Sequence, residues 1–206
     1  MRVGIMGTGA MARALGGGWV RAGHEVLVGG RDAERTAALA AGTGARPGTL
    51  AEAARFGGAT LLALPYDAVL PALGTVDPGR ILIDCTNAVG PGPVLTTGEG
   101  PGAARTLAAA TGARVVKAFN HVTPTVWSRT PPVFADGPVA VPLCGDDEEA
   151  LALVAALAAD LGCAPFVAGP LAHADLLEAT TAFLIGLWTS GRDPRAMLPP
   201  PAALEG

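Results

Sequence analysis

The feature that most constrains the fold is a glycine-rich hexapeptide that directly follows a short apolar run. Arg2–Met6 predicts a buried strand, and Gly7-Thr8-Gly9-Ala10-Met11-Ala12 then opens a segment that predicts a helix to Ala22. In such a GxGxxA pattern the first glycine forms a tight turn, the second lets a phosphate approach the backbone, and the third small residue lets helix and strand pack closely. The helix N-terminus adds amide donors for an anion. We therefore expect a dinucleotide to contact Gly7, Thr8, Gly9, Ala10 and Met11.

Predicted strands and helices alternate along the rest of the chain. Continuous apolar runs predict strands at 25–28, 59–64, 80–84, 114–119, 139–143 and 165–167. Between and after them, helices are expected at 32–41, 49–55, 67–73, 103–110, 146–161 and 171–188. Residues 123–138 hold four prolines and no clean period, which predicts a loop or connector. The alternation predicts an α/β fold of the Rossmann-like, doubly wound type: a mainly parallel sheet with helices on both faces and a short C-terminal helix.

Length and composition narrow the function classes. The 206 residues suit one domain, and we expect residues 1–190 to form a single NADP-binding unit followed by a proline-rich tail at 191–206. A net charge of −4 argues against a nucleic-acid partner. The most hydrophobic stretch, 150–159, has about half the length that a membrane-spanning helix needs. Three scattered cysteines without CxxC spacing and three scattered histidines predict neither disulfides nor a metal site. We expect a cytoplasmic protein.

The segment after the second predicted strand indicates which dinucleotide is bound. NAD enzymes place an acid at this point for the adenine ribose, whereas this chain has Gly30 and Arg31. Gly30 leaves room for a phosphate, and Arg31 can bind that phosphate through its planar guanidinium group. Arg35 lies one helical turn further on and could face the same way. We predict NADP rather than NAD. The alternative is a solvated helix start, with Asp32 as its N-cap and both arginines in water.

The carboxyl ends of the later strands supply the remaining candidates, because open α/β sheets keep their ligand crevice at that edge. Leu64 and Pro65 end one strand, and Asn87 and Asn120 follow two others. Each asparagine could hold a carboxamide or could simply bond its own turn backbone. The sequence assigns no catalytic residue; His121 and Tyr66 are the candidates for a proton donor.

Lys117 is the chain's single lysine, three residues before Asn120 and on or near the opposite side of the predicted strand. Its charge would need a partner there.

These motifs together resemble the NADPH-dependent reductases of the deazaflavin coenzyme F420. The similar segments are Gly7–Gly9, Ala22–Val26, Gly29–Glu34, Val116–Asn120, Cys144–Asp147 and Ala168–Leu171, within a resemblance that spans about Arg2–Trp188. Family members commonly carry serine where this chain has Gly30, and a small or aliphatic residue where it has His121. The resemblance implies a small Rossmann protein, usually a homodimer, that passes hydride between NADPH and F420.

Three functional hypotheses remain open from the sequence. The first is the NADPH:F420 oxidoreductase, in which positioning of two flat rings carries most of the rate. The second is an NADPH-dependent reductase of a small imine or carbonyl substrate, and the third is an NADPH sensor without turnover. An apolar face of the last helix could form a dimer seam or pack on its own sheet; it comprises Leu176, Leu177, Phe183, Leu184 and Leu187.

Overall fold

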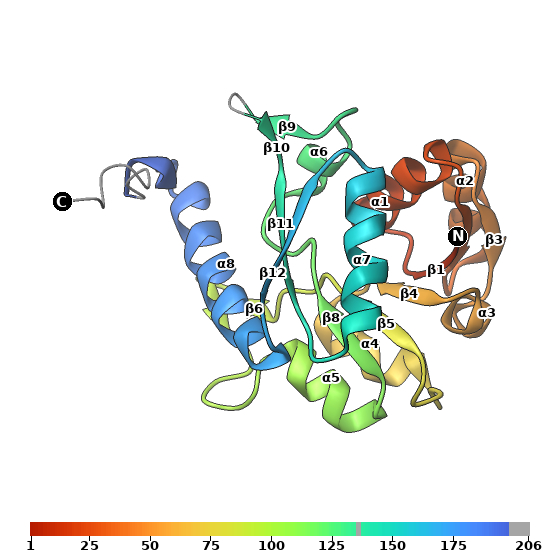
Figure 1. Ribbon diagram of the computed structural model, residues 1–206, viewed down its shortest axis with the longest axis horizontal. Coiled ribbons are helices and arrows are strands. Elements are labelled where there is room, and N and C mark those ends of the chain that lie inside the picture. The colour runs from red at the N-terminus through yellow and green to blue at the C-terminus, as the bar shows by residue number, and fades with distance from the viewer. Residues whose placement is uncertain (135–136, 198–206) are drawn as a thin grey trace.

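The computed structural model describes residues 1–134 and 137–197, and a continuous eight-stranded sheet organises them (Figure 1). The strand order is β12-β11-β8-β5-β4-β1-β2-β3. The strands are β1 (Arg2–Met6), β2 (Glu25–Gly29), β3 (Arg46–Gly48), β4 (Ala59–Leu62), β5 (Ile81–Asp84), β8 (Arg114–Lys117), β11 (Ala140–Cys144) and β12 (Ala164–Gly169). Neighbouring strands in this sheet pair in parallel except β11 with β8, which meet antiparallel at Cys144 and Lys117. The predicted Rossmann-like, mainly parallel α/β fold is confirmed.

Helices cover both faces of the sheet, and each face has its own core. The helices are α1 (Ala10–Arg21), α2 (Ala33–Thr43), α3 (Leu50–Arg55), α4 (Tyr66–Leu73), α5 (Ala103–Thr111), α6 (Pro124–Trp127), α7 (Glu148–Asp160) and α8 (Ala174–Thr189). Strand residues alternate between the two cores: Ile83 packs with Trp19 of α1 on one face, and Leu82 packs with Leu107 of α5 on the other. This alternation explains why the central strands are apolar at every position.

Side-chain caps begin two of the helices, and the one at Asp32 was expected from the sequence. The Asp32 carboxylate accepts a hydrogen bond from the Arg35 backbone N–H at 3.0 Å and begins α2. Thr49 and Glu52 form a reciprocal capping box at the start of α3. Both caps satisfy backbone donors that have no partner inside the helix, which is why each helix starts where it does.

Several boundaries differ from the prediction. The strand expected at 59–64 ends at Leu62. The strand expected at 114–119 ends at Lys117, because Phe119 adopts a positive φ of 62° that turns the chain out of the sheet. The connector at 123–138 contains α6 and both strands of a small hairpin, β9 (Val133–Phe134) with β10 (Gly137–Pro138).

Some short elements were not predicted at all. These are β3 and a second hairpin, β6 (Val89–Gly90) with β7 (Val94–Leu95). Their few residues include glycine and proline, so they carry no strand pattern.

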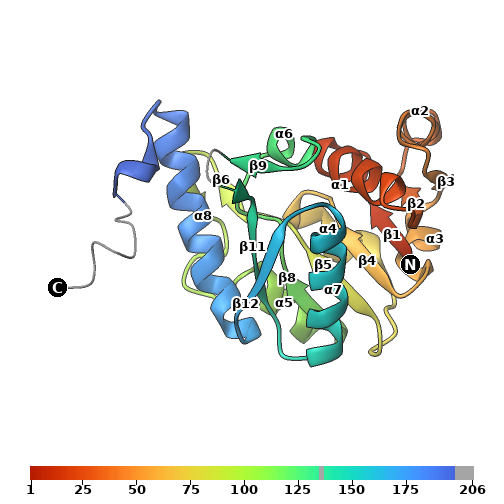
Figure 2. The same ribbon diagram turned by 45° about the horizontal axis from the view of Figure 1, so that its top comes forward.

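Helix α8 stands at the β12 end of the molecule, as both views show (Figures 1 and 2). The 3-10 turn η1 (Leu171–His173) leads into it, and a second turn, η2 (Pro194–Met197), follows it. The predicted tail at 191–206 is described only as far as residue 197, and the rest lies outside the described residues. Glu178 and Thr181 of α8 contact Lys117 and Asn120, so α8 borders the carboxyl end of β8 and can close a site there.

Candidate functional site

The glycine loop between β1 and α1 has the three properties that the pattern predicts. Gly7 has φ +124°, and a Cβ there would lie 2.1 Å from the Ala63 carbonyl oxygen, so only glycine makes this turn. A Cβ on Gly9 would meet no protein atom within 4 Å. Ala12 is fully buried where α1 packs on the sheet. Packing therefore explains Gly7 and Ala12 but does not explain Gly9, whose open side is free for a phosphate.

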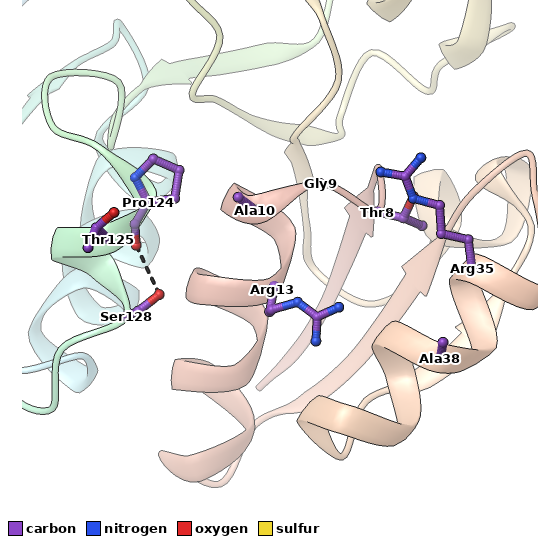
Figure 3. Close-up of a pocket in the computed structure, with 9 residues that line it drawn as sticks. All are labelled: Thr8, Gly9, Ala10, Arg13, Arg35, Ala38, Pro124, Thr125 and Ser128. Atoms are coloured by element: carbon purple, nitrogen blue, oxygen red, sulfur yellow. Dashed lines mark hydrogen bonds between the residues drawn. The ribbon is translucent and has the colours of Figure 1, made fainter.

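A cavity of about 500 Å³, the phosphate-loop cavity, opens over this turn (Figure 3). It brings together the loop, residues of α1 and α2 that include two arginines, and α6 with the residue that follows it. They are Thr8, Gly9, Ala10, Arg13, Arg35, Ala38, Pro124, Thr125 and Ser128. Figure 3 shows α1 between α6 on one side and α2 on the other, with Arg13 extending toward α2. The predicted residues Thr8, Gly9, Ala10 and Arg35 therefore share one cavity.

The arginines near this cavity carry unpaired charge. Arg13, Arg31 and Arg35 form no ion pair and no side-chain hydrogen bond with any described residue. Arg35 lines the cavity, whereas Arg31 is exposed and is not among the lining residues. Arg13 was missed by the sequence reasoning, although it lies four residues after Gly9 and so on the same helix face. The cluster is suited to an anionic ligand.

Packing, rather than the expected room for a phosphate, explains the missing side chain of Gly30. A Cβ there would lie 2.4 Å from Thr36 Oγ1 and 2.6 Å from Thr8 Cγ2. The missing side chain thus lets the phosphate loop and α2 approach the end of β2.

A second cavity, of about 220 Å³, lies at the carboxyl ends of β5 and β8; we call it the crevice cavity. Its lining combines the first turn of α1, the two strand ends, the start of the connector and α8. The residues are Met11, Cys85, Asn87, Phe119, Asn120, His121, Val122, Thr123, Pro124, Thr181, Ile185 and Trp188. Ala10 and Met11 are consecutive but line different cavities, and Pro124 lines both. The two cavities therefore meet at the N-terminus of α1.

The two asparagines in the crevice cavity bond each other across the sheet edge. Asn87 Nδ2 donates to the Asn120 backbone oxygen at 2.8 Å, and Asn120 Nδ2 donates to Asn87 Oδ1 at 3.1 Å and to Thr181 Oγ1 at 3.2 Å. The alternative that each side chain bonds its own turn backbone is wrong. Asn120 Oδ1 is buried and has no partner among the described residues, so one acceptor is left for a ligand N–H.

The other candidates of the sequence analysis separate in space. Leu64, Pro65 and Tyr66 line neither cavity. Tyr66 is half-buried at the first position of α4, and Leu64 Cδ2 lies 3.5 Å from the Cβ position of Gly7. His121 does line the crevice cavity, edge-on to the Trp127 ring at 5.5 Å between centroids.

His121 is held in its neutral form. Burial lowers its pKa from 6.5 to about 4, an effect that the Ala140 backbone only partly opposes. At neutral pH the imidazole therefore carries no charge, and it is poorly suited to give up a proton as an imidazolium acid.

This shift predicts a specific pH dependence of stability. Because the folded pKa lies below the unfolded one, the unfolded chain binds more protons between pH 6.5 and pH 4, and the stability from His121 is lost as pH falls through that window. Denaturant titrations at pH 7 and pH 5 should show the wild type losing on the order of 2 kcal/mol more than His121→Gln. Equal losses in the two proteins would contradict the shift.

Lys117 has the partners that its charge requires. Its Nζ lies 2.9 Å from Asp84 Oδ2 and 2.9 Å from Glu178 Oε1, and it donates to the Thr86 backbone oxygen at 2.7 Å. Burial lowers the pKa of Lys117, but the carboxylates of Asp84 and Glu178 outweigh that effect and raise it. The residue is fully buried and lines neither cavity, so the structure gives it no direct contact with a ligand.

Neither a metal site nor a membrane-spanning helix is found among the described residues. No three His, Cys, Asp or Glu side chains in 1–134 and 137–197 gather in a way that could hold a metal ion. Among the described helices, none combines the length and the apolar character needed to cross a bilayer.

Comparison with known proteins places this geometry in a family. The family model described as NADP oxidoreductase, coenzyme F420-dependent, matches residues 2–88. The F420-dependent NADP reductase of Methanothermobacter marburgensis is 30% identical over 91% of this chain and 92% of its own length. This chain belongs to the F420-dependent NADP reductase family.

Solved structures agree with this family in fold. A crystal structure from Arthrobacter sp. FB24, provisionally assigned as an F420-dependent NADP reductase, superposes with a TM-score of 0.80 at 25% identity and covers 92% of this chain and 95% of its own. A hypothetical protein from Sinorhizobium meliloti gives a TM-score of 0.74 at 27% identity, covering 82% and 84%. An imine reductase from Aspergillus terreus, with a TM-score of 0.66 at 24% identity, covers 89% of this chain but only 60% of its own; it shares the fold alone.

Proposed function

We propose that this member of the F420-dependent NADP reductase family transfers hydride between NADPH and the deazaflavin coenzyme F420. The observation that carries the proposal is the meeting of the two cavities at the first turn of α1. One cavity offers a phosphate loop and unpaired arginines, and the other is largely apolar with a pair of asparagines that bond each other. A single dinucleotide lying across Pro124 would place its phosphates in the first cavity and its nicotinamide in the second.

The residues present fit NADPH. Gly9 leaves open space beside the amides at the start of α1, and Thr8 and Arg35 line the same cavity; Arg31 is exposed and follows the end of β2. We assign the pyrophosphate to Gly7–Met11 and the 2′-phosphate to Gly30, Arg31 and Arg35. Leu64, which lies beside Gly7, and Pro65 would border the cofactor outside the two cavities, and Asn87 and Asn120 would border the nicotinamide.

The side chains of the crevice cavity favour hydride transfer between two bound rings. NADPH, when bound, supplies the hydride, and the chain has to hold the two rings together and exclude water. His121 is neutral and Tyr66 lies outside the cavity, so neither candidate is placed as a proton donor to a carbonyl or imine. The cavity therefore supports the deazaflavin acceptor better than the alternative of a small imine or carbonyl substrate.

One assay tests the function directly. NADPH oxidation is followed at about 340 nm and the deazaflavin band at about 420 nm, with and without oxidised F420. Loss of both bands at comparable rates is the expected result. NADPH binding without loss of the deazaflavin band would overturn the proposal and leave a small imine or carbonyl as acceptor. If NADPH is oxidised neither by F420 nor by a small imine or carbonyl, the sensor hypothesis is favoured.

We propose further that the protein is a homodimer that buries the outer face of α8 and β12. Leu176 and Phe183 of α8 are 65% and 54% exposed, and Phe166 and Val167 of β12 are 50% and 60% exposed. Exposed apolar side chains gathered on one edge favour burial by a second copy. Leu177, also expected in this seam, instead packs on its own core.

Sedimentation of the wild type and of Leu176→Glu/Phe183→Glu tests the dimer. The wild type should sediment as a dimer at micromolar concentration, and the variant should dissociate while its helix content is unchanged. A wild-type monomer would contradict the proposal.

The remaining expectations are also proposals. We infer a single NADP-binding domain over residues 1–190, a cytoplasmic location, and small-molecule or coenzyme partners rather than nucleic acid or membranes. The continuous sheet and the net charge of −4 support them.

A further inference from the structure

The buried ammonium of Lys117 bonds three segments that each supply a neighbouring residue to the crevice cavity. An ammonium group has three N–H donors. Here one faces the Asp84 carboxylate on β5, one faces the Thr86 backbone oxygen in the following loop, and one faces Glu178 on α8. Lys117 itself lies on β8. One cation therefore links β8, the end of β5 and α8.

Each of these contacts leads to a residue of the cavity. Thr86, whose N–H also donates to Asp84 Oδ1 at 2.9 Å, directly precedes Asn87. Lys117 precedes Asn120 by three residues. Glu178 lies one helical turn before Thr181, which accepts the Asn120 hydrogen bond. The cluster thus holds the three polar groups that bond one another in the cavity.

Glu178 extends the connection to the other side of the sheet edge. Its carboxylate also accepts from the backbone N–H groups of Ala103 at 2.8 Å and Ala104 at 3.2 Å, at the N-terminus of α5. Two carboxylates and one ammonium leave a net negative charge in a buried place, and the positive end of α5 offsets it. The ammonium and both carboxylates of the cluster each have several bonding partners, so their geometry is closely determined.

We propose that Lys117 is a positioning residue that sets the distance between α8 and the Asn87–Asn120 pair and thereby shapes the acceptor side of the crevice cavity. Only the kinetic test of this inference, which measures turnover, rests on the proposed function. Lys117 is too deeply buried to touch a ligand, and it acts through Thr86, Asn120 and Glu178.

The test compares Lys117→Met and Glu178→Gln with Leu157→Ala. Methionine keeps an unbranched chain of similar length but no donor, and Glu178→Gln leaves Lys117 and Asp84 as a balanced pair if the first variant fails to fold. Leu157 is fully buried in α7 and lines neither cavity, so Leu157→Ala lowers the melting temperature without touching the cluster.

Amide exchange measured without any substrate is the first readout. Each variant is measured the same number of degrees below its own melting temperature. Amide exchange at Thr86, Ala103 and Ala104 should then be faster in the cluster variants than in the wild type, but not in Leu157→Ala. Unchanged exchange at these amides would overturn the proposal.

Kinetics is the second readout. In the cluster variants kcat should fall about tenfold or more while KM for NADPH changes little, because the phosphate-loop cavity is not connected to the cluster. Equal kcat per folded molecule in all variants would overturn the positioning role. If the wild type shows no turnover with F420, the proposed function fails, and the exchange measurement still decides the role of Lys117.

Discussion

Gly9→Ala should leave the protein folded and raise its dissociation constant for NADPH about 100-fold. Gly9 has φ −81° and ψ −172°, which alanine adopts readily, and a Cβ there would meet no protein atom within 4 Å. The methyl group would therefore cost the fold almost nothing. It would occupy the space beside the first amides of α1, where we expect the pyrophosphate to approach the backbone.

Gly7→Ala is the matched comparison. Its φ of +124° and the 2.1 Å approach of the Ala63 carbonyl oxygen to the new Cβ should destabilise the protein by about 1–3 kcal/mol from backbone strain alone, with the clash adding to it. Thermal unfolding and NADPH titration by fluorescence distinguish the two effects. A Gly9→Ala protein that binds NADPH like the wild type would show that the phosphates lie elsewhere.

Arg35→Ala should raise KM for NADPH by about 10- to 100-fold and leave KM for NADH nearly unchanged. Arg35 lines the phosphate-loop cavity without a carboxylate partner among the described residues, and a hydrogen bond to a charged group contributes about 1.5–3 kcal/mol. Arg31→Ala should act in the same direction, because Arg31 follows the end of β2.

Arg55→Ala is the control for the loss of one positive charge. Arg55 is exposed on α3 and lines neither cavity. Steady-state kinetics with both nucleotides decides the matter: equal changes for NADPH and NADH in Arg31→Ala and Arg35→Ala would contradict the 2′-phosphate assignment.

The sheet could be predicted because its strands are apolar on both faces and its helices have clear starts. Asp32 and Thr49 begin helices where the sequence predicts, since the capping groups are local. Strand ends were less predictable. Apolar residues continue to Phe119, but β8 ends earlier because Phe119 has a positive φ. Its ring packs between the rings of Trp19 and Trp127.

The candidate site divides in a similar way. Thr8, Gly9 and Arg35 could be predicted to lie together because the βαβ unit brings the loop and the start of α2 to one edge. Tyr66 could not be excluded from sequence, because its distance from the crevice depends on how α4 packs. Arg13 was overlooked because a basic residue on an exposed helix face has no signal of its own.

The sequence by itself determined the fold class and the glycine-rich turn at the start of α1, because these depend on glycines, caps and apolar runs within about thirty residues, and it predicts a phosphate at the end of β2. Only the tertiary structure decided that Asn87 bonds Asn120, that Lys117 meets Asp84 and Glu178, and that α8 borders the crevice. Those partners are 33 to 61 residues apart in the chain. They are brought together by strand register and helix packing, which no local pattern encodes.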